Sequence, residues 1–227
     1  MLNTIKSYAK INLFLNVVNK LDTGFHELNS VLSRIDLYDE IRIKDESSFS
    51  ISYNGPFGDQ VGSNDNVSRL FNYLIDKNYL KQKLFAIQVV KNIPVGSGLG
   101  GGSSNVAEII KYLIRSNLLD NSSSTEIARD LGSDIEFFID EGSALISGKG
   151  NVDQRFKINS DKHFLIVFPN VQNSTKEIFN KHSNLSGEKF SYNKDTNLDG
   201  ILKNTSNELE KTALLANQEM KKIREYL

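Results

Sequence analysis

Apolar and polar side chains alternate strictly near the start of the chain, over residues 8–18. The apolar set is Ala9, Ile11, Leu13, Leu15 and Val17. Because successive side chains of a strand point to opposite faces, this period of two predicts a β-strand that buries one face. Lys10 and Asn12 share the other face. Within the strand alone, a solvated surface lysine explains Lys10 more simply than a cation aimed into a cleft.

The pattern changes its period around a glycine-rich segment in the middle of the chain. A β-favouring apolar stretch at residues 85–90 precedes the segment, and apolar positions at helical spacing follow it: Val106, Ile109, Ile110, Leu113 and Ile114. We therefore predict a strand, a loop and a helix that begins at Ser103 or Ser104.

Five glycines lie within residues 96–102 of this predicted loop. Glycine lets the backbone approach an anion closely, and the first turn of a helix presents free N–H groups and the positive end of its dipole. We therefore predict that the loop holds the phosphates of a nucleotide. The predicted binding residues are Pro94, Gly96, Ser97, Gly98, Leu99, Gly100, Gly101, Gly102, Ser103 and Ser104.

Glycine-rich loops of other kinds make different demands on the sequence. A Walker A loop ends in Gly-Lys-Ser/Thr, and no lysine stands at the end of this loop. Gly96, Gly98 and Gly101 satisfy the dinucleotide pattern G-x-G-x-x-G, but Asp120, near the offset of the ribose acid, closes a helix instead of ending a second strand. A glycine-rich surface turn that binds nothing is the remaining alternative.

The other patterns before residue 150 add short strands and helices. They predict a turn at 22–24, a helix at 66–80 and strands at 28–35, 41–43, 49–53 and 142–148. A capping-box signature at 123–126 predicts a short helix, which Gly132 ends. With a domain junction at 149–151, the order of the elements favours an α+β fold in two subdomains.

Beyond that junction the patterns are weaker. An apolar run at 163–168 predicts a buried strand, residues 174–181 a helix, and the polar stretch 183–200 a loop. A second capping-box signature at 205–208 predicts one long helix with an apolar face formed by Leu209, Ala213, Ala216, Met220, Ile223 and Leu227.

Composition narrows the classes of function. The 227 residues include 27 basic and 28 acidic side chains and no cysteine. This balance argues against a general electrostatic affinity for nucleic acid or membranes, and the missing cysteines exclude disulfides and thiolate metal sites. The three histidines lack metal-ligand spacing, and the chain shows neither an apolar signal core nor an apolar stretch of bilayer length. We expect a cytoplasmic globular protein without a resident metal.

Asp134 follows the turn Gly132-Ser133, where a helix-capping or turn aspartate is the simpler interpretation. Phosphoryl transfer to a hydroxyl group needs a carboxylate that takes the proton and a cation that favours the developing alkoxide. Lys10 and Asp134 are the candidates for this pair, although neither residue identifies itself alone.

Several segments together resemble the GHMP small-molecule kinases. Residues 94–107 are similar to the second signature of that family. Residues 9–15 and 24–28 resemble the branch that phosphorylates cytidine diphosphate-linked methylerythritol, and the segments 64–67, 131–135, 169–171 and 174–175 follow in the same order. The resemblance therefore covers essentially the whole chain.

The resemblance implies a two-domain α+β fold with the site in the cleft between the domains. Residues 1–150 would form the N-terminal domain, similar to ribosomal protein S5 domain 2, and 151–227 a truncated C-terminal α/β sandwich. The resemblance also implies that Asp134 deprotonates the tertiary 2-hydroxyl of the methylerythritol. Lys10 would steady that hydroxyl and favour the charged carboxylate. The loop would hold the ATP phosphates, with Mg²⁺ bridging their oxygens.

The same resemblance implies the residues that bind the acceptor. Phe25 and His26 would read cytosine, one by stacking and one by hydrogen bonding, although core packing explains Phe25 equally well. Asn12 would hydrogen-bond the substrate, and Thr175 would line the acceptor site. The expected partner is this small molecule, bound by a monomer or a weak homodimer.

The chain departs from the family pattern in three places. Phe25 stands where tyrosine is usual, Glu136 adds a negative charge where proline is frequent, and no glycine follows Gly200, where relatives carry another glycine-rich motif. Two alternatives stay open: a sister kinase for mevalonate, homoserine or a sugar, and a nucleotide-binding module without turnover. The segment 24–26 argues against the first, and the retained Lys10 and Asp134 argue against the second.

Overall fold

The structure is a computed structural model of the chain. It describes residues 4–22, 24, 26–82, 85–158, 163–169, 171, 175–182, 185, 189–191, 198–203 and 206–226. The chain forms two compact units that interleave along the sequence. The first unit is Met1–Lys10, Ile35–Val95 and Leu99–Glu141, and the second is Ile11–Arg34, Gly96–Gly98 and Gly142–Leu227.

Strands of the first unit carry their apolar side chains on one face. β4 (Phe85–Val90) pairs in parallel with β3 (Ser50–Asn54) and antiparallel with the second half of β2 (His26–Asp45), with Ile41 opposite Val89. β1 (Thr4–Lys20) also pairs with β2. Burial alternates along β4, as the period of two requires.

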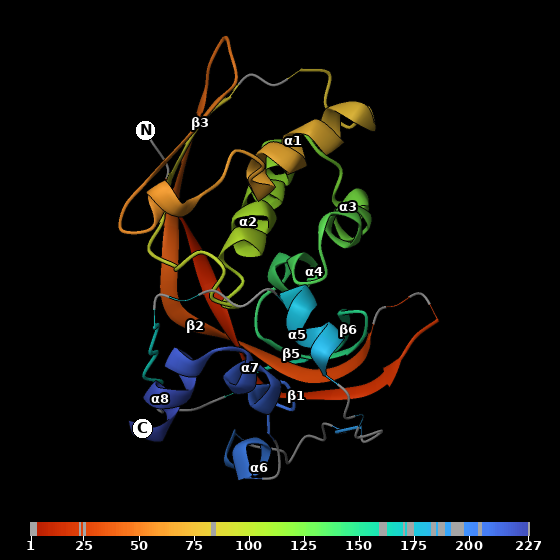
Figure 1. The fold of residues 1–227 in the computed structure, drawn as a ribbon. Coiled ribbons are helices and arrows are strands. Elements are labelled where there is room, and N and C mark those ends of the chain that lie inside the picture. Colours follow the sequence, from red (N-terminus) through yellow and green to blue (C-terminus); the bar gives the residue numbers. More distant parts are fainter. Residues whose placement is uncertain are drawn as a thin grey trace. The chain divides into compact units, whose positions relative to one another are not determined.

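Helices α1 (Asn66–Asp76), α2 (Gly101–Arg115), α3 (Ser124–Leu131) and α4 (Ile135–Ile139) complete the first unit, with short 3₁₀ turns at Gly58–Gln60 and Asn121–Ser123. They lie on one side of its strands (Figure 1). The core of this unit includes fully buried side chains from strands and helices: Ile41, Leu70, Leu74, Val89, Ile109, Ile110 and Leu113. The glycine-rich loop therefore joins β4 to a helix that is anchored in the core.

The second unit is built on the first half of β2. Residues 28–32 of β2 pair antiparallel with β5 (Ser143–Gly148), and β5 pairs antiparallel with β6 (Asn151–Phe156). Its described helices are α5 (Thr175–Lys181), α6 (Leu198–Lys203), α7 (Glu210–Ala216) and α8 (Gln218–Tyr226). A buried apolar cluster joins strand and helix residues: Leu13, Phe14, Val31, Leu198 and Ile201.

Most elements predicted before residue 150 are confirmed, with changes at their ends. The two strands predicted at 28–35 and 41–43 are one strand, β2. The helix predicted at 66–80 ends at Asp76, since Asn78 adopts a positive φ of 59° and leaves the helix. α2 begins at Gly101, before either predicted serine, because Gly100 in the left-handed conformation takes the N-cap position. α3 lies where predicted, but Ser123 makes no side-chain capping bond.

Three predictions after residue 150 are wrong. Residues 163–169 form no strand, and Phe164, Leu165, Ile166 and Val167 are 38–84% exposed. The predicted loop at 183–200 is wrong at its end, because α6 begins at Leu198 and continues to Lys203. The predicted long helix is divided into α7 and α8 because Asn217 leaves helical geometry and its Oδ1 accepts the N–H groups of Glu219 and Met220. This amide caps the second helix.

The predicted division of the chain after residue 150 stays a prediction. Residues 149–150 form the turn between β5 and β6, and both strands belong to the second unit. β6 itself was not predicted, because its mostly polar sequence shows no alternation.

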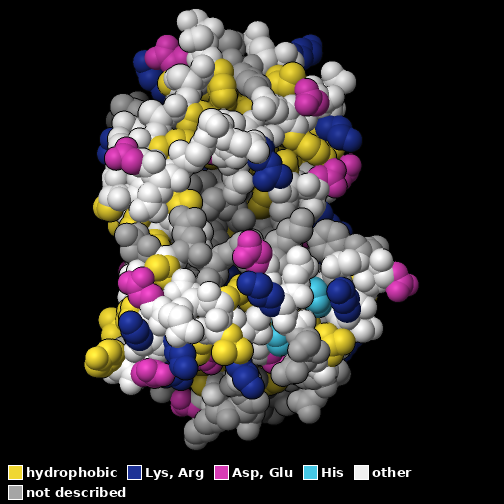
Figure 2. Space-filling model, viewed as in Figure 1, with side chains coloured by type: hydrophobic (Ala, Val, Ile, Leu, Met, Phe, Trp, Pro, Cys, Tyr) yellow, Lys and Arg dark blue, Asp and Glu magenta, His cyan; other side chains and the backbone are white. Residues whose placement is uncertain are grey.

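Charged side chains of both signs are mixed on the surface of the molecule. On the face drawn in Figure 2, Lys and Arg side chains are interspersed with Asp and Glu. Within the described ranges no helix is long and apolar enough to cross a bilayer.

Candidate active site

The glycine-rich loop follows β4 and ends at the N-terminus of α2. Gly96, Gly98 and Gly100 have φ values of +72°, +75° and +73°. Gly100 also lies in a close approach, because a Cβ atom there would be 2.9 Å from the Phe138 ring and 3.1 Å from Cγ of Lys10. Only glycine meets both requirements at this position, so the backbone of the loop can lie directly against the lysine side chain.

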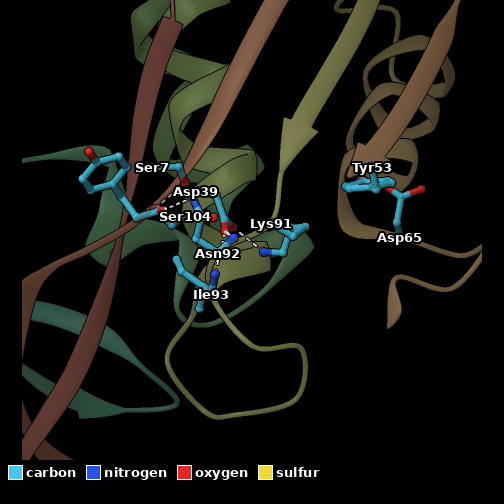
Figure 3. A network of polar contacts seen from close by, with 9 residues as sticks. Ser7, Asp39, Tyr53, Asp65, Lys91, Asn92, Ile93 and Ser104 are labelled. Carbon is cyan, nitrogen blue, oxygen red and sulfur yellow. Dashed lines mark hydrogen bonds and ion pairs between the residues drawn. The ribbon is translucent and has the colours of Figure 1, made fainter. Parts of the chain in front are cut away.

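The start of α2 has backbone donors that no helical carbonyl can accept. The first intrahelical bond runs from Ser104 N–H to Gly100 O, at 2.8 Å. The N–H groups of Gly101, Gly102 and Ser103 precede it and therefore have no intrahelical acceptor. The Ser104 hydroxyl is buried and accepts from the Ser7 hydroxyl at 2.8 Å, which holds the helix to β1 (Figure 3). The predicted phosphate cradle thus presents backbone donors, while the Ser104 side chain has a structural contact.

Lys10 is buried, with 6% of the residue exposed, so the solvated lysine favoured by the strand pattern alone is wrong. Its Nζ lies 3.5 Å from Oδ2 of Asp134. Its backbone N–H donates to Leu99 O in the loop at 2.9 Å. The loop covers what would otherwise be the open face of β1, and this explains why alternation misplaces the lysine.

Asp134 stands at the N-cap position of α4, but its side chain makes no capping hydrogen bond. The carboxylate faces Lys10 and is 38% exposed. Asp134 therefore occupies the predicted cap and turn position, but its carboxylate does not act as a cap. A partly exposed carboxylate beside a buried cation and a phosphate-type loop is suited to take a proton from a hydroxyl group.

Glu136, two residues further on, is held by Arg129. The guanidinium Nε and Nη2 donate to the two carboxylate oxygens, both at 2.8 Å. This hydrogen bonding and the opposite charge raise the pKa of Arg129 above its ordinary value. The additional negative charge near Asp134 is therefore compensated by a bidentate partner.

Two of the predicted acceptor-binding residues are described in the second unit. Asn12 Nδ2 donates to the Ser30 hydroxyl at 2.8 Å, and that hydroxyl donates to Phe14 O. His26 is 9% exposed, and its ring stacks on Phe179 of α5, with centroids 5.2 Å apart. Burial, with smaller contributions from Lys20 and His182, lowers the pKa of His26. A neutral imidazole can both donate and accept a hydrogen bond.

Phe179 was missed by the sequence analysis. Its helix was predicted, but one aromatic residue on a short helix carries no pattern that distinguishes a binding residue from a packing residue. Phe25 and the side chain of Thr175 lie outside the described residues. Gly24 is described, and its N–H donates to Leu21 O at 2.9 Å with φ +81°, which confirms the predicted turn before His26.

No metal cluster is present in the part of the chain that the structure describes, which has no group of three His, Cys, Asp or Glu side chains able to hold an ion. An open groove of about 910 Å³ lies elsewhere in the first unit, at the ends of β2, α1 and α2. Asp45, Tyr79 and Leu118 are among its lining residues, which include no predicted site residue.

Comparisons with known proteins identify relatives of this chain. Residues 66–145 match the family described as GHMP kinases N terminal domain. The 4-diphosphocytidyl-2-C-methyl-D-erythritol kinase of Pelagibacter ubique is 36% identical over 228 residues, covering 98% of this chain and 80% of its own length. The enzymes of that name from Prochlorococcus marinus (strain MIT 9301) and Thermotoga maritima are 38% and 32% identical, over 79% and 76% of this chain and 59% and 62% of their own lengths.

Solved structures show the same fold. A crystal structure of 4-(cytidine 5'-diphospho)-2C-methyl-D-erythritol kinase has a TM-score of 0.74 at 23% identity and covers 98% of this chain and 81% of its own. A crystal structure of mevalonate kinase has a TM-score of 0.54 at 17% identity, with 98% and 80% covered. The predicted α+β GHMP kinase fold is thus confirmed, and the chain belongs to the 4-diphosphocytidyl-2-C-methyl-D-erythritol kinase family.

Proposed function

We propose that the chain transfers the γ-phosphate of ATP to the 2-hydroxyl group of 4-diphosphocytidyl-2-C-methyl-D-erythritol. Its relatives carry the name of this kinase, and kinases of this family use ATP as the phosphate donor. The observation that carries the chemical part of the proposal is the pair Lys10 Nζ and Asp134 Oδ2, 3.5 Å apart, with Lys10 bonded through its backbone to the glycine-rich loop.

The loop binds the phosphates through its backbone. The N–H groups of Gly101, Gly102 and Ser103 point out of the first turn of α2, together with the positive end of the helix dipole. Phosphate oxygens bind such donors without any lysine of the Walker A type.

Asp134 acts as the general base. It takes the proton of the acceptor hydroxyl while that oxygen forms its bond to the γ-phosphorus, and the bond from the γ-phosphorus to the bridging oxygen breaks, so that ADP leaves. Lys10 stabilises the negative charge that develops on the attacking oxygen.

His26 reads the cytosine by hydrogen bonds. Its pKa is lowered by burial, so the ring is neutral near pH 7 and offers one donor and one acceptor to the edge of the base. Phe179, already stacked on His26, supplies an aromatic surface for the base. Phe25, Asn12 and Thr175 complete the proposed acceptor site.

Mg²⁺ accompanies the nucleotide in this proposal. Magnesium is commonly held by substrate phosphates with one or two protein carboxylates and several waters, and it does not require a cage of protein ligands. When bound, it supplies positive charge to the transferring phosphoryl group.

The test is a transfer assay with radiolabelled ATP on four acceptors: the cytidine-bearing compound, mevalonate, homoserine and galactose. We expect transfer to the cytidine-bearing acceptor alone. Transfer to another acceptor would keep the kinase and refute the cytosine site. ATP binding without transfer to any of them would favour a nucleotide-binding module, which the comparisons do not support.

A further inference from the structure

A buried ion pair lies at the base of the glycine-rich loop. Asp39 of β2 is fully buried, and Lys91, the residue after β4, is 4% exposed. The Lys91 ammonium group contacts Oδ2 of Asp39 (Figure 3). Taking two charges out of water is costly, so the pair needs good geometry and further hydrogen bonds to compensate that cost.

The second carboxylate oxygen of Asp39 holds the segment that leads into the loop. Oδ1 accepts the backbone N–H groups of Asn92 and Ile93, at 2.8 and 2.9 Å. The Asn92 side chain also donates to Tyr38 O at 3.1 Å. The two residues before Pro94 are therefore tied to β2 by bonds to one charged side chain and its neighbour.

Lys91 reaches the other end of the loop. A Cβ atom on Gly101 would lie 3.1 Å from Lys91 Nζ and 2.9 Å from Cγ2 of the buried Ile93. The ammonium group thus lies against the first residue of α2. A cation is unfavourable at a helix N-terminus, so Asp39 has to compensate it there.

We propose that Asp39 is a positioning residue for the nucleotide loop. It acts through Asn92 and Ile93 at the start of the loop and through Lys91 at Gly101, and it does not touch ATP itself. This inference rests on the proposed function of the loop as the phosphate site. Its consequence is that loss of Asp39 weakens nucleotide binding and leaves the acceptor site unchanged.

The test compares Asp39→Asn with wild type in two measurements. Calorimetry gives the Kd of ADP, and steady-state kinetics give KM for ATP and for the acceptor. If the binding-competent loop falls to a tenth of its population, Kd and KM for the nucleotide rise about tenfold. KM for the acceptor stays within about twofold of wild type, which separates loop positioning from general damage.

Lys111→Met is the matched control. Lys111 pairs with Glu108 in the same unit, on α2 beyond its first turn, and Glu108 is 8% exposed. This variant also leaves a nearly buried carboxylate without its lysine, and we expect nucleotide binding as in wild type. A folded Asp39→Asn protein that binds ADP as tightly as wild type, or a Lys111→Met protein that is weakened equally, would overturn the proposal.

A double variant covers the case in which Asp39→Asn does not fold. Asp39→Asn combined with Lys91→Met removes both buried charges and leaves no unpaired ion. A neutral amide replaces the charged acceptor of the Asn92 and Ile93 N–H groups, so the start of the loop is held less firmly and Kd for ADP rises about tenfold. Wild-type affinity in this variant would refute the positioning role. If wild type binds ADP but transfers no phosphate, the proposed function fails while a weakened Asp39→Asn still supports this inference.

Discussion

Two lysine–aspartate pairs lie in the first unit, and they differ in how closely the charges approach and in how exposed the carboxylate is. Lys91 and Asp39 are in direct contact, both are nearly inaccessible, and each oxygen of Asp39 has a donor. Lys10 and Asp134 are 3.5 Å apart, and the Asp134 side chain is 38% exposed and makes no capping bond. One carboxylate is fully used by the protein, and the other is accessible to a substrate.

The difference separates positioning from catalysis. A carboxylate that is saturated with donors and closed to solvent stabilises the loop but cannot accept a proton from a hydroxyl group outside. A loosely paired carboxylate contributes little to stability and keeps its capacity to accept. Substitutions in the two pairs should therefore affect different quantities.

Asp134→Asn should give the largest effect. We expect kcat to fall by about 10²–10⁴, because a general base acts in the transition state. Nucleotide affinity and both KM values should change little. Kinetics and ADP calorimetry measure these quantities, with Asp130→Asn as the control, since Asp130 is an exposed aspartate that accepts from Tyr73. Wild-type kcat in Asp134→Asn would remove Asp134 from the mechanism.

Asp39→Asn should lower the stability of the fold much more than Asp134→Asn does. Removing one partner of a buried pair leaves an uncompensated charge, so we expect the free energy of unfolding to fall by about 3–5 kcal/mol. Asp134→Asn should change it by less than about 1 kcal/mol, because that pair is partly exposed. Urea unfolding of both variants measures the contrast. Equal losses in the two variants would show that the pairs do not differ as their burial indicates.

Only one of the two pairs could be proposed from the sequence. Lys10 and Asp134 stand within segments that resemble a family, so their roles could be carried over before any geometry was known. Asp39 and Lys91 are separated by 52 positions, and each reads as an ordinary charged residue at the edge of a β pattern. Nothing local indicates that the two meet, because the pairing of β2 with β4 brings them together.

For the fold, too, features encoded by neighbouring residues were predictable, and features that depend on distant or side-chain contacts were not. The loop and α2 were predictable because glycines, an apolar stripe and a strand follow each other in the chain. The apolar run at 163–168 indicated a strand, yet a strand also needs a neighbour to accept its hydrogen bonds, and a run of residues does not report one. Asn217 divides a helix through bonds of its side chain to the next turn, which periodicity does not register.

His26 belongs to neither pair, and we expect its titration to have a smaller effect, on KM for the acceptor. Burial lowers the pKa of His26 from its ordinary value of 6.5, so the imidazole stays neutral at pH values somewhat below 6.5. The neutral group contributes stability that is fully present above pH 6.5 and is lost as pH falls through its lowered pKa. We expect KM for the acceptor to rise in that acidic range while KM for ATP stays constant. His26→Gln should raise the acceptor KM about tenfold and flatten this pH dependence. A pH dependence equal to that of wild type in His26→Gln would exclude His26 as its source.

Arg129→Met should give the smallest effect. It tests the charges that surround the pair of Lys10 and Asp134. Arg129 is more than half exposed and binds both oxygens of Glu136, which is nearly buried. Without Arg129, the charge of Glu136, two residues from Asp134, loses its bidentate partner. We expect kcat to fall by no more than about twofold, because the guanidinium binds Glu136 and is not part of the pair of Lys10 and Asp134. Arg129→Met combined with Glu136→Gln removes that charge and should restore kcat. A loss of kcat that the second substitution does not rescue would mean that Arg129 acts on the position of α4 and not on the charge beside Asp134.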